Sequence, residues 1–448
     1  MNNYQIKTVI TLGPASDSEQ TIKKFAAGGA SIFRLNFSHN TPDYFGRLID
    51  MINDINARLN KHVSILLDLP GPKIRTGNPI GGKLELLEGE TYSLGPDCQI
   101  PVSRQILSEL PSKGGIKLAD GKLELKIIDK LKGKLVVRAM NSGTLLDRQS
   151  INSQGLLYER SYPTKNDKAA ISFGLKKGIT SFALSFVSRK KDVTKVRDIV
   201  GEDIVLVSKI ERREALRNFK EIAIASDAIM IARGDLGLNI DIAEVPLVQR
   251  KLIRASNQLR RPVITATQML ESMTTNVMPT RAEVNDVFNS VYEGSDAVML
   301  SEETAIGAYP LRAFEMLKRI TWKSQYFDDP QEHRESGPHE ALVGAAAYII
   351  LSAGVKNVVF LTRGGAGPIN LSRYHTNARI FALTDKKNVL DKLNIARGVE
   401  PFYFENLDTG VRKFIDGAGR RFGIKGTTLV IRSTVEHGPA NSLELISI

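Results

Sequence analysis

The chain has 448 residues, of which 42% are hydrophobic, 6% aromatic and 25% charged, a composition typical of a globular protein with several domains. No stretch approaches the ~18 continuous apolar residues of a membrane span, so we expect no membrane partner. The formal charge of +12 is spread along the chain without a compact basic tract, which argues against nucleic acid. It leaves phosphorylated small substrates, or simple solubility, as the reason for the charge. The single cysteine, Cys98, cannot form a disulfide within the chain, so we expect a reducing, cytoplasmic location.

One pattern recurs from the start of the chain to about residue 325. A short apolar run rich in β-branched residues ends in a polar residue, and a stretch with helical period follows, as in residues 21–29, 44–59 and 214–226. The apolar runs are residues 4–13, 30–38, 62–71, 180–187, 203–211, 228–237, 262–270 and 297–304. Eight β/α units in series predict a parallel sheet that closes into a (β/α)8 TIM barrel.

Two segments depart from this pattern. Short strand-like runs without helical period, such as 82–94 and 121–140, predict a small β-barrel domain inserted after the third strand. After a polar linker at 325–340, helix and strand signals alternate again and predict a C-terminal α/β domain, a possible site of effector binding. The predicted domains are a barrel (1–73 and 161–335), an inserted lid (74–160) and a C-terminal domain (336–448).

The active site of a β/α barrel lies at the carboxyl ends of its strands, so the polar residues there are candidates. A purely structural barrel end needs few charges, yet six of these ends carry them. The candidates are Arg34, Asn36 and Ser38; Asp68, Lys73 and Arg75; Lys209 and Glu211; Arg233, Gly234 and Asp235; Thr265 and Thr267; and Ser301, Glu302 and Glu303. Carboxylates and cations that converge in this way predict a metal-assisted reaction on an anionic substrate.

Lys209 and Glu211 stand two residues apart on one strand and therefore face the same side. In isolation the pair would be an ordinary exposed ion pair, but at a barrel mouth we favour a functional role. Glu211 and Asp235, on neighbouring strands, can hold one Mg²⁺ or Mn²⁺, since magnesium commonly takes one or two carboxylates. Lys209 can neutralise charge on a phosphoryl group during transfer.

The run 228–237, AIMIARGDLG, is predicted to end a strand and open a short helix. Gly234 lets a ligand approach the backbone closely, and N–H groups at a helix start bind anions. A strand-to-helix turn that binds no ligand is equally compatible with this sequence. His39 fits a residue that stacks on a base and a plain loop residue equally well.

With these residues assembled, the chain resembles the pyruvate kinase family over nearly its whole length. The shared motifs, in order, are TLGPAS, RLNFSH, GPKIRTG, SKIE, ASDAIMIARGDLG, TATQMLESM and PTRAEVNDV. The resemblance implies a barrel with a β-domain inserted after its third strand and a C-terminal α/β domain. It also implies phosphoryl transfer from phosphoenolpyruvate to ADP in glycolysis, a divalent metal and a homotetramer.

The resemblance also implies a role for each residue that matches a motif. Lys209 would stabilise the phosphoryl group, Glu211 and Asp235 would hold the metal, and Thr267 would lie near the substrate carboxylate and the enolate. The other implied contacts are Arg34 to the transferring phosphate; Ala232, Arg233, Gly234 and Asp235, through their backbone, to the substrate carboxylate; Pro14, Asn36, His39 and Arg75 to the nucleotide; and Asp120, in the inserted domain, to the closed site.

Some positions depart from the family pattern. Glu302 replaces a glycine near the active face, where it can crowd a turn or add negative charge. Asn166 stands where the family has a lysine that faces the nucleotide, and Lys165 or Lys168 can substitute for it. Thr362 and Arg363 lie in the loop that binds a sugar bisphosphate activator in many members. That loop keeps few hydroxyl residues here, which argues against this activator and leaves another phosphorylated effector open.

The monovalent-cation region differs as well. Members of the family that depend on K⁺ carry a glutamate at the position of Lys73 and a hydroxyl residue at that of Leu69. The other K⁺ ligands would map to Asn36, Ser38 and Asp68. Because a lysine brings a tethered ammonium, we expect Lys73 to replace the ion, so that K⁺ is not required.

Two other functions stay open at this stage. A weakened paralogue with a regulatory or binding role would explain Glu302 and Asn166, although it would be expected to lose residues such as Lys209. A barrel lyase that forms a metal enolate would share the carboxylate pair but would not need Arg34 and Arg75.

Overall fold

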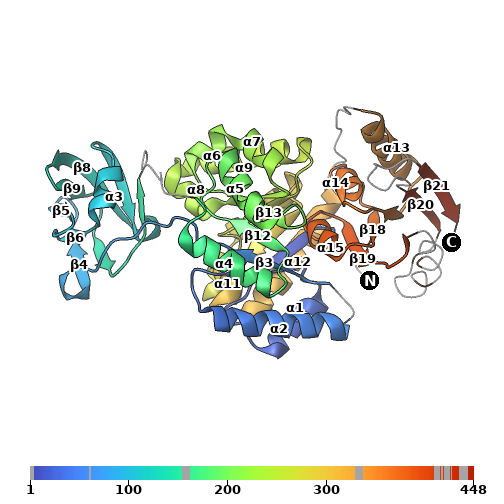
Figure 1. The fold of residues 1–448 in the computed structure, drawn as a ribbon, viewed down its shortest axis with the longest axis horizontal. Helices are drawn as coiled ribbons and strands as arrows, with labels where there is room; N and C mark the ends of the chain where they lie inside the picture. The colour runs from blue at the N-terminus through green and yellow to red at the C-terminus, as the bar shows by residue number, and fades with distance from the viewer. Residues whose placement is uncertain are drawn as a thin grey trace.

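The computed structural model describes residues 5–59, 62–153, 162–327, 337–407, 414, 417, 424, 426–432 and 442–447. Figure 1 shows three bodies in a row, with the barrel between the inserted segment and the C-terminal segment. The predicted lid boundary at 160 and the predicted C-terminal boundary at 336 both fall on residues outside these ranges. The domain boundaries therefore stay predictions.

The central body is a closed barrel of eight strands in the order β1-β16-β15-β14-β13-β12-β3-β2, with every neighbouring pair parallel. The strands are β1 (Lys7–Thr11), β2 (Ile32–Asn36), β3 (Ser64–Asp68), β12 (Ser181–Leu184), β13 (Val205–Ile210), β14 (Ala228–Ala232), β15 (Val263–Ala266) and β16 (Ala297–Leu300). Each lies inside one of the eight apolar runs, so the predicted TIM barrel is confirmed.

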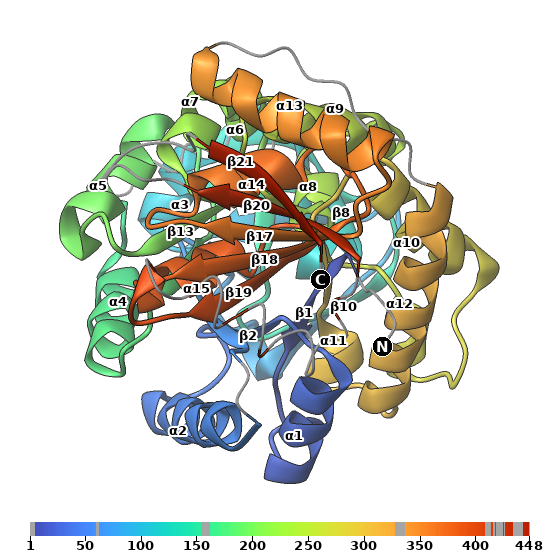
Figure 2. The same cartoon turned by 90° about the vertical axis from the view of Figure 1, so that its right-hand side faces the viewer.

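Helices surround the barrel, as the view along its axis shows (Figure 2). They are α1 (Glu19–Gly28), α2 (Pro42–Leu59), α4 (Lys165–Lys176), α5 (Lys190–Val200), α6 (Arg213–Arg217), α7 (Phe219–Ala225), α8 (Arg233–Asn239), α9 (Val245–Gln258), α10 (Arg281–Tyr292), α11 (Glu302–Ala305) and α12 (Pro310–Ser324), with one-turn 3₁₀ segments at Ile242–Glu244, Glu271–Thr274 and Gln325–Phe327. Helices α4 and α10 begin with capping boxes at Thr164 and Thr280. In each, the threonine side chain accepts from the backbone N–H three residues later, and the side chain of that later residue accepts from the threonine N–H. The helical stretch predicted at 214–226 is broken at Asn218 into α6 and α7.

The barrel interior is filled by side chains that point inward from alternate strand positions. Val9, Leu66, Val207 and Met230 belong to this buried cluster, and Ile395 of the C-terminal segment is part of it as well. The barrel is therefore a packed core, with one of its side chains supplied from outside the barrel sequence.

The inserted segment lies between β3 and α4 and folds around its own apolar core. It comprises β4 (Lys83–Leu86), β5 (Thr91–Gly95), β6 (Ile100–Pro101), α3 (Arg104–Glu109), β7 (Gly114–Leu118), β8 (Leu123–Leu131), β9 (Lys134–Ala139), β10 (Gly143–Leu146) and β11 (Ile151–Ser153), with one-turn 3₁₀ segments η1 (Ile80–Gly82) and η2 (Ala119–Gly121). The described strands pair as a six-stranded sheet and a two-stranded sheet, not as the closed small barrel that was predicted. No strand pairing among the described residues joins these two sheets, so they do not close into a ring.

The C-terminal segment forms a five-stranded sheet in the order β19-β18-β17-β20-β21, with only β21 antiparallel. Its elements are α13 (Pro338–Ser352), β17 (Asn357–Leu361), α14 (Ala366–Ser372), β18 (Arg379–Thr384), α15 (Lys387–Leu393), β19 (Val399–Tyr403), β20 (Thr427–Arg432) and β21 (Ser442–Ser447). The predicted α/β fold of this segment is confirmed. Within the described residues, no helix combines the length and the apolar character needed to cross a membrane.

A tight turn fixes where the chain leaves the barrel for the inserted segment. Gly71 has φ +65°, and a Cβ there would lie 2.8 Å from Cδ2 of Phe186 and 2.9 Å from Cβ of Ser185. Its N–H donates to Oδ1 of Asp167 at 2.8 Å, which ties the turn to the first turn of α4. Only glycine fits this position, because it needs both the left-handed backbone and the missing side chain.

Candidate active site at the barrel mouth

Asp68, the last residue of β3, joins two cations at the barrel mouth. Its Oδ2 accepts from Nε of Arg34 at 2.7 Å and lies 2.6 Å from the Nη2 atom of the same guanidinium. Its Oδ1 lies 3.3 Å from Nζ of Lys209. Burial alone would raise the pKa of the Asp68 carboxyl, but Lys209 and Arg34 outweigh burial and hold it below its usual value. Asp68 therefore stays charged and fixes both cations in place.

Lys209 is buried among anions. Its Nζ lies 2.9 Å from Oε1 of Glu211 and donates to Oγ of Ser185 at 2.8 Å. Burial opposes its charge, but Asp68 and Glu211 outweigh burial and raise its pKa above the ordinary value. The two-residue spacing thus places the lysine and the glutamate on one side of β13, as predicted, and the lysine keeps its proton at neutral pH.

Glu211 has the character of a metal ligand. Its Oε2 accepts from the N–H of Phe186 at 2.6 Å, while its buried Oε1 has an ion pair to Lys209 but no hydrogen bond of good geometry among the described residues. Burial raises the pKa of Glu211, and the nearby carboxylate of Asp235 raises it further. A divalent cation between the two carboxylates would relieve that repulsion.

The described residues contain no group of three or more histidine, cysteine, aspartate or glutamate side chains arranged to hold a metal. Two carboxylates are nevertheless enough for Mg²⁺, because its remaining ligands are commonly water and substrate oxygens. Glu211 and Asp235 therefore fit a cation that is shared with a substrate, and they do not fit a closed structural metal site.

The start of α8 meets the end of β15. The N–H of Gly234 donates to Oγ1 of Thr267 at 2.8 Å, and Thr267 has φ +68°. Ala232 ends β14 and Arg233 begins the helix, so the four predicted cradle residues form one strand-to-helix turn. Because Thr267 already occupies the N–H of Gly234, this turn and Thr267 form a single unit.

Asn36 and His39, two of the residues predicted to face the nucleotide, stand at and just after the end of β2. Asn36 accepts from the N–H of Ser38 at 3.3 Å, and His39 is exposed. Burial of part of the ring lowers the pKa of His39, and the cations Lys73, Arg34 and Arg75 lower it further, while Glu302 acts in the opposite sense. His39 is therefore neutral at physiological pH, in a field that is mainly positive.

Pro14 and Arg75 are the other residues predicted to face the nucleotide. Pro14 is exposed. Arg75 donates to the backbone oxygen of Arg148 at 3.0 Å, within the hinge of the inserted segment.

The inserted segment reaches the mouth through η2. Asp120, with φ +53°, accepts from Oγ of Ser150 at 2.7 Å, and its Oδ1 lies 3.6 Å from Nζ of Lys73. Lys117 donates to the backbone oxygen of Gly237 in α8 at 3.5 Å. Lys73 is thus paired with the lid residue Asp120, whereas Leu69 is buried in the barrel core and offers no side-chain oxygen to a cation.

The structure places the residues that depart from the family pattern without backbone strain. Glu302 is the first residue of α11, its side chain is exposed, and its backbone is not left-handed, so it does not strain the turn. Asn166, Lys165 and Lys168 are exposed in the first turn of α4. In the C-terminal loop, Thr362 accepts from the N–H of Gly365 at 3.0 Å, and Arg363 lies 3.3 Å from Asp385.

Sequence reasoning missed Ser185 at the mouth. Ser185 bridges Lys209 and Asp68, to which it donates at 3.1 Å, and it stands just after β12. Because Ser185 is a polar residue directly after the fourth strand, its position at a strand end is the signal that indicates it. Glu303, by contrast, was among the candidates: it is buried, accepts from the N–H groups of Leu270 and Ser301 at 3.0 and 2.6 Å, and joins the ends of β15 and β16.

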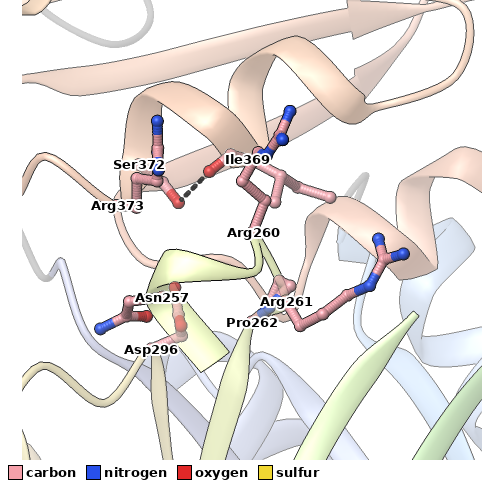
Figure 3. Close-up of a pocket in the computed structure, with 8 residues that line it drawn as sticks. All are labelled: Asn257, Arg260, Arg261, Pro262, Asp296, Ile369, Ser372 and Arg373. Carbon is pink, nitrogen blue, oxygen red and sulfur yellow. Dashed lines mark hydrogen bonds between the residues drawn. The ribbon is translucent and has the colours of Figure 1, made fainter. Parts of the chain in front are cut away.

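A hollow on the molecule lies far from this chemistry, between the barrel base and the C-terminal segment (Figure 3). It is lined by Asn257, Arg260, Arg261, Pro262, Asp296, Ile369, Ser372 and Arg373. The side chains of Arg260, Arg261 and Arg373 point in different directions in Figure 3, so they do not form a converging anion site. The charged groups converge at the mouth instead, which makes the mouth the candidate active site.

Comparison with known proteins agrees with this geometry. The family description "Pyruvate kinase, barrel domain" matches residues 3–314, and "Pyruvate kinase, alpha/beta domain" matches residues 340–448. The chain is 36% identical to pyruvate kinase of Thermococcus litoralis over 421 residues, covering 89% of each chain. It is 36% identical to that of Geobacillus stearothermophilus over 469 residues, covering 99% of this chain and 79% of the relative. The crystal structure of a pyruvate kinase from Cryptosporidium parvum superposes with a TM-score of 0.91 at 29% identity, covering 99% of this chain and 96% of the other.

Proposed function

The chain belongs to the pyruvate kinase family, and we propose how the residues at its barrel mouth divide the work of transferring a phosphoryl group from phosphoenolpyruvate to ADP. The observation that carries this assignment is a line of alternating charges, Arg34–Asp68–Lys209–Glu211, held by contacts of 2.6 to 3.3 Å at the ends of three strands. Phosphoryl transfer requires mainly positioning and charge neutralisation, and this line supplies both.

Lys209 and Arg34 bind the transferring phosphoryl group from two directions. Both cations are already oriented by Asp68, so little reorganisation accompanies the reaction. Lys209 keeps its charge throughout, because its raised pKa lies well above neutral pH. It therefore acts by electrostatic stabilisation and does not donate a proton.

Glu211 and Asp235 would hold a divalent cation, Mg²⁺ or Mn²⁺. When bound, such an ion neutralises negative charge on substrate oxygens. The support for this proposal is the buried oxygen of Glu211 that lacks a hydrogen bond, together with the repulsion from Asp235. Thr267 and the turn at Ala232–Asp235 orient the carboxylate end of phosphoenolpyruvate.

ADP would occupy the side of the mouth lined by Pro14, Asn36, His39 and Arg75. The cations there attract its phosphates, and a neutral His39 can lie against a base without adding charge. Closure of the inserted segment, through Asp120, would exclude water during transfer. As for other features of the family, we propose a cytoplasmic homotetramer and leave the effector of the C-terminal loop unassigned.

The ammonium of Lys73 would make K⁺ unnecessary. Lys73 acts on His39 together with Arg34 and Arg75, so its charge reaches the nucleotide side of the mouth. Its ion pair to Asp120 holds that charge between the barrel and the lid. Lys73 would thus supply from the hinge the positive charge that a monovalent ion brings elsewhere.

The decisive measurement is pyruvate formation from phosphoenolpyruvate and ADP with Mg²⁺, in buffers that contain K⁺ or only tetramethylammonium. We expect ADP-dependent turnover in both buffers, and no turnover after chelation of the divalent ion. Absence of turnover in both buffers would favour the alternative, a paralogue with a regulatory or binding role. Turnover that needs K⁺ would support the kinase activity but contradict the proposed role of Lys73. A Lys73→Glu variant that gains a K⁺ response would support that role.

A further inference from the structure

The side chain of Arg233 is buried and aimed away from the mouth. Its Nη2 donates to the backbone oxygens of Thr267 at 2.6 Å and Gln268 at 3.1 Å, and its Nε donates to the oxygen of Thr267 at 3.2 Å. Its remaining nitrogen, Nη1, donates to Oδ1 of Asp286 at 2.7 Å and to Oε1 of Gln249 at 3.2 Å. Every nitrogen of the guanidinium therefore has an acceptor, and the side chain has no capacity left for a ligand.

The backbone that Arg233 holds has an unusual conformation. Thr267 and Gln268 follow each other with φ of +68° and +52°. A left-handed backbone is uncommon for any residue with a side chain, and most of all for a β-branched one such as threonine. Strained residues of this kind persist only where the surrounding structure determines them. Here that determination comes from Arg233, which bonds the carbonyl oxygens of both residues.

The same turn is held a second time, from the neighbouring residue. The N–H of Gly234 donates to Oγ1 of Thr267, and that hydroxyl donates to the oxygen of Ala266 at 2.6 Å. The side chain of Arg233 thus sets the backbone of Thr267, while the backbone of Gly234 sets its hydroxyl. Two consecutive residues of α8 fix both the position and the direction of one side chain at the mouth.

The far side of this clamp is anchored in α10. Asp286, which pairs with Arg233, belongs to the motif PTRAEVNDV, to which the reaction itself assigns no role. Glu283 of the same motif accepts from the N–H of Ser272 at 2.7 Å and from the N–H of Thr280 at 2.7 Å. The segment that follows β15 is therefore bound to the first turns of α10 in two ways. Ser272 binds Glu283 directly, and Thr267 is linked to Asp286 through Arg233.

We propose that Arg233, braced by Asp286, is a positioning residue for the transfer reaction, which holds Thr267 in its left-handed conformation so that its hydroxyl faces the substrate. It acts through Thr267 and does not touch the substrate with its side chain. This inference rests on the proposed role of Thr267 beside the substrate carboxylate and the enolate.

The test compares Arg233→Lys with Arg261→Lys. Arg261 is a matched control, because it also donates to two consecutive backbone oxygens, those of Ala223 and Ile224, both at 2.9 Å, but at the opposite end of the barrel. A lysine cannot reproduce the planar fork at either site. We expect Arg233→Lys to lower kcat by about 10- to 100-fold, since a shift of ~1 Å in a catalytic group costs about that much. Arg261→Lys should leave kcat within about two-fold of wild type, by the same principle.

A double-mutant cycle separates positioning from general damage to the fold. If Arg233 acts through Thr267, then Arg233→Lys combined with Thr267→Ala should have a kcat no more than about two-fold below that of Thr267→Ala alone, because coupled residues are not additive. Multiplied losses in the double variant, or a normal kcat in Arg233→Lys, would overturn the proposal.

Asp286→Asn provides a second route should Arg233→Lys fail to fold. It keeps the size of the side chain and removes its charge, so we expect a kcat lower by about two- to five-fold with the same coupling to Thr267. An uncoupled loss, or an unchanged kcat, would contradict the proposed brace. If the wild-type enzyme showed no ADP-dependent turnover, the proposed function would fail, whereas an active wild type with an uncoupled Arg233→Lys would refute only this clamp.

Discussion

The two ends of the barrel handle buried charge in opposite ways. At the mouth, Asp68, Lys209 and Glu211 are held mainly by one another, and one oxygen of Glu211 is left without a hydrogen bond. At the base, both oxygens of Asp296 accept from backbone N–H groups, those of Arg397 at 3.0 Å and Val263 at 2.9 Å. One carboxylate oxygen at the mouth thus has no hydrogen bond from the described residues, whereas both oxygens of the carboxylate at the base are bonded to the backbone.

Residues of the C-terminal segment make apolar contacts and hydrogen bonds with the base of the barrel. Ile395 enters the apolar cluster of the barrel interior, and Asn394 donates to the backbone oxygens of Ser31 and His62. Lys7 donates to the backbone oxygen of Val399, and the N–H of Gly398 donates to the oxygen of Gln5 at 2.8 Å. The base is therefore closed by a plug, defined here as residues 394–399, and the same strands can be stabilised at one end while they stay reactive at the other.

The largest expected effect compares a buried lysine at each end. Lys209→Met should lower kcat by about 10²–10³-fold, because it removes a preorganised charge from the transition state. Phosphoenolpyruvate binding, measured by calorimetry, should persist. Lys7→Met is the matched control, since Lys7 is also buried but donates to a backbone oxygen at the base. Similar losses of kcat in the two variants would refute the division between the two ends.

The next effect tests the plug. Ile395→Ala should lower the free energy of unfolding by about 2–4 kcal/mol, as removal of a buried aliphatic group usually does. The kcat of the folded enzyme should not change, because the plug lies at the base. Urea unfolding can be followed by the fluorescence of Trp322, the single tryptophan, in α12. Ile80→Ala, at a residue that is 96% exposed, is the control and should change little. A plug variant as stable as this control would contradict the role of Ile395.

The smallest effect concerns pH. Burial raises the pKa of Asp296 to about 6, although the N–H groups of Arg397 and Val263 pull it down. Between about pH 4 and 6 the folded state therefore binds more protons at this residue than the unfolded state, so its contribution to stability is lost as pH rises through 6. The loss amounts to at most roughly 3 kcal/mol, since one pKa unit corresponds to about 1.4 kcal/mol. Asp296→Asn should remove this slope from the pH dependence of the free energy of unfolding.

Asp227 provides a control of the opposite sign. Burial would raise the pKa of its carboxyl, but Lys392, the N–H of Leu206 and Arg197 outweigh burial and lower it. Its contribution to stability is therefore lost as pH falls, and Asp227→Asn should remove a slope in that direction. If the two variants changed the pH dependence in the same sense, the assignment of Asp296 would be wrong.

Much of the fold could be predicted because its signals are local. Each barrel strand lies within an apolar run, and the polar residue after each run marks the mouth, where Arg34, Asp68, Lys209 and Glu211 do meet. The open sheets of the inserted segment were not predicted, because hydrogen bonding between distant strands leaves little trace in the local pattern. The break at Asn218 was not predicted either. Ser185 carries the same local signal as the other candidates, since it is polar and directly follows β12.

The eight β/α units and the charged residues at their carboxyl ends follow from the amino-acid sequence, since strand period and strand ends are properties of short segments. Tertiary structure alone decided that Asp68 binds both Arg34 and Lys209, that the buried side chain of Arg233 holds a turn 34 residues away, and that Ile395 fills the base of a barrel that begins at Lys7. These contacts join residues far apart in the chain, and their geometry exists only once the barrel has closed.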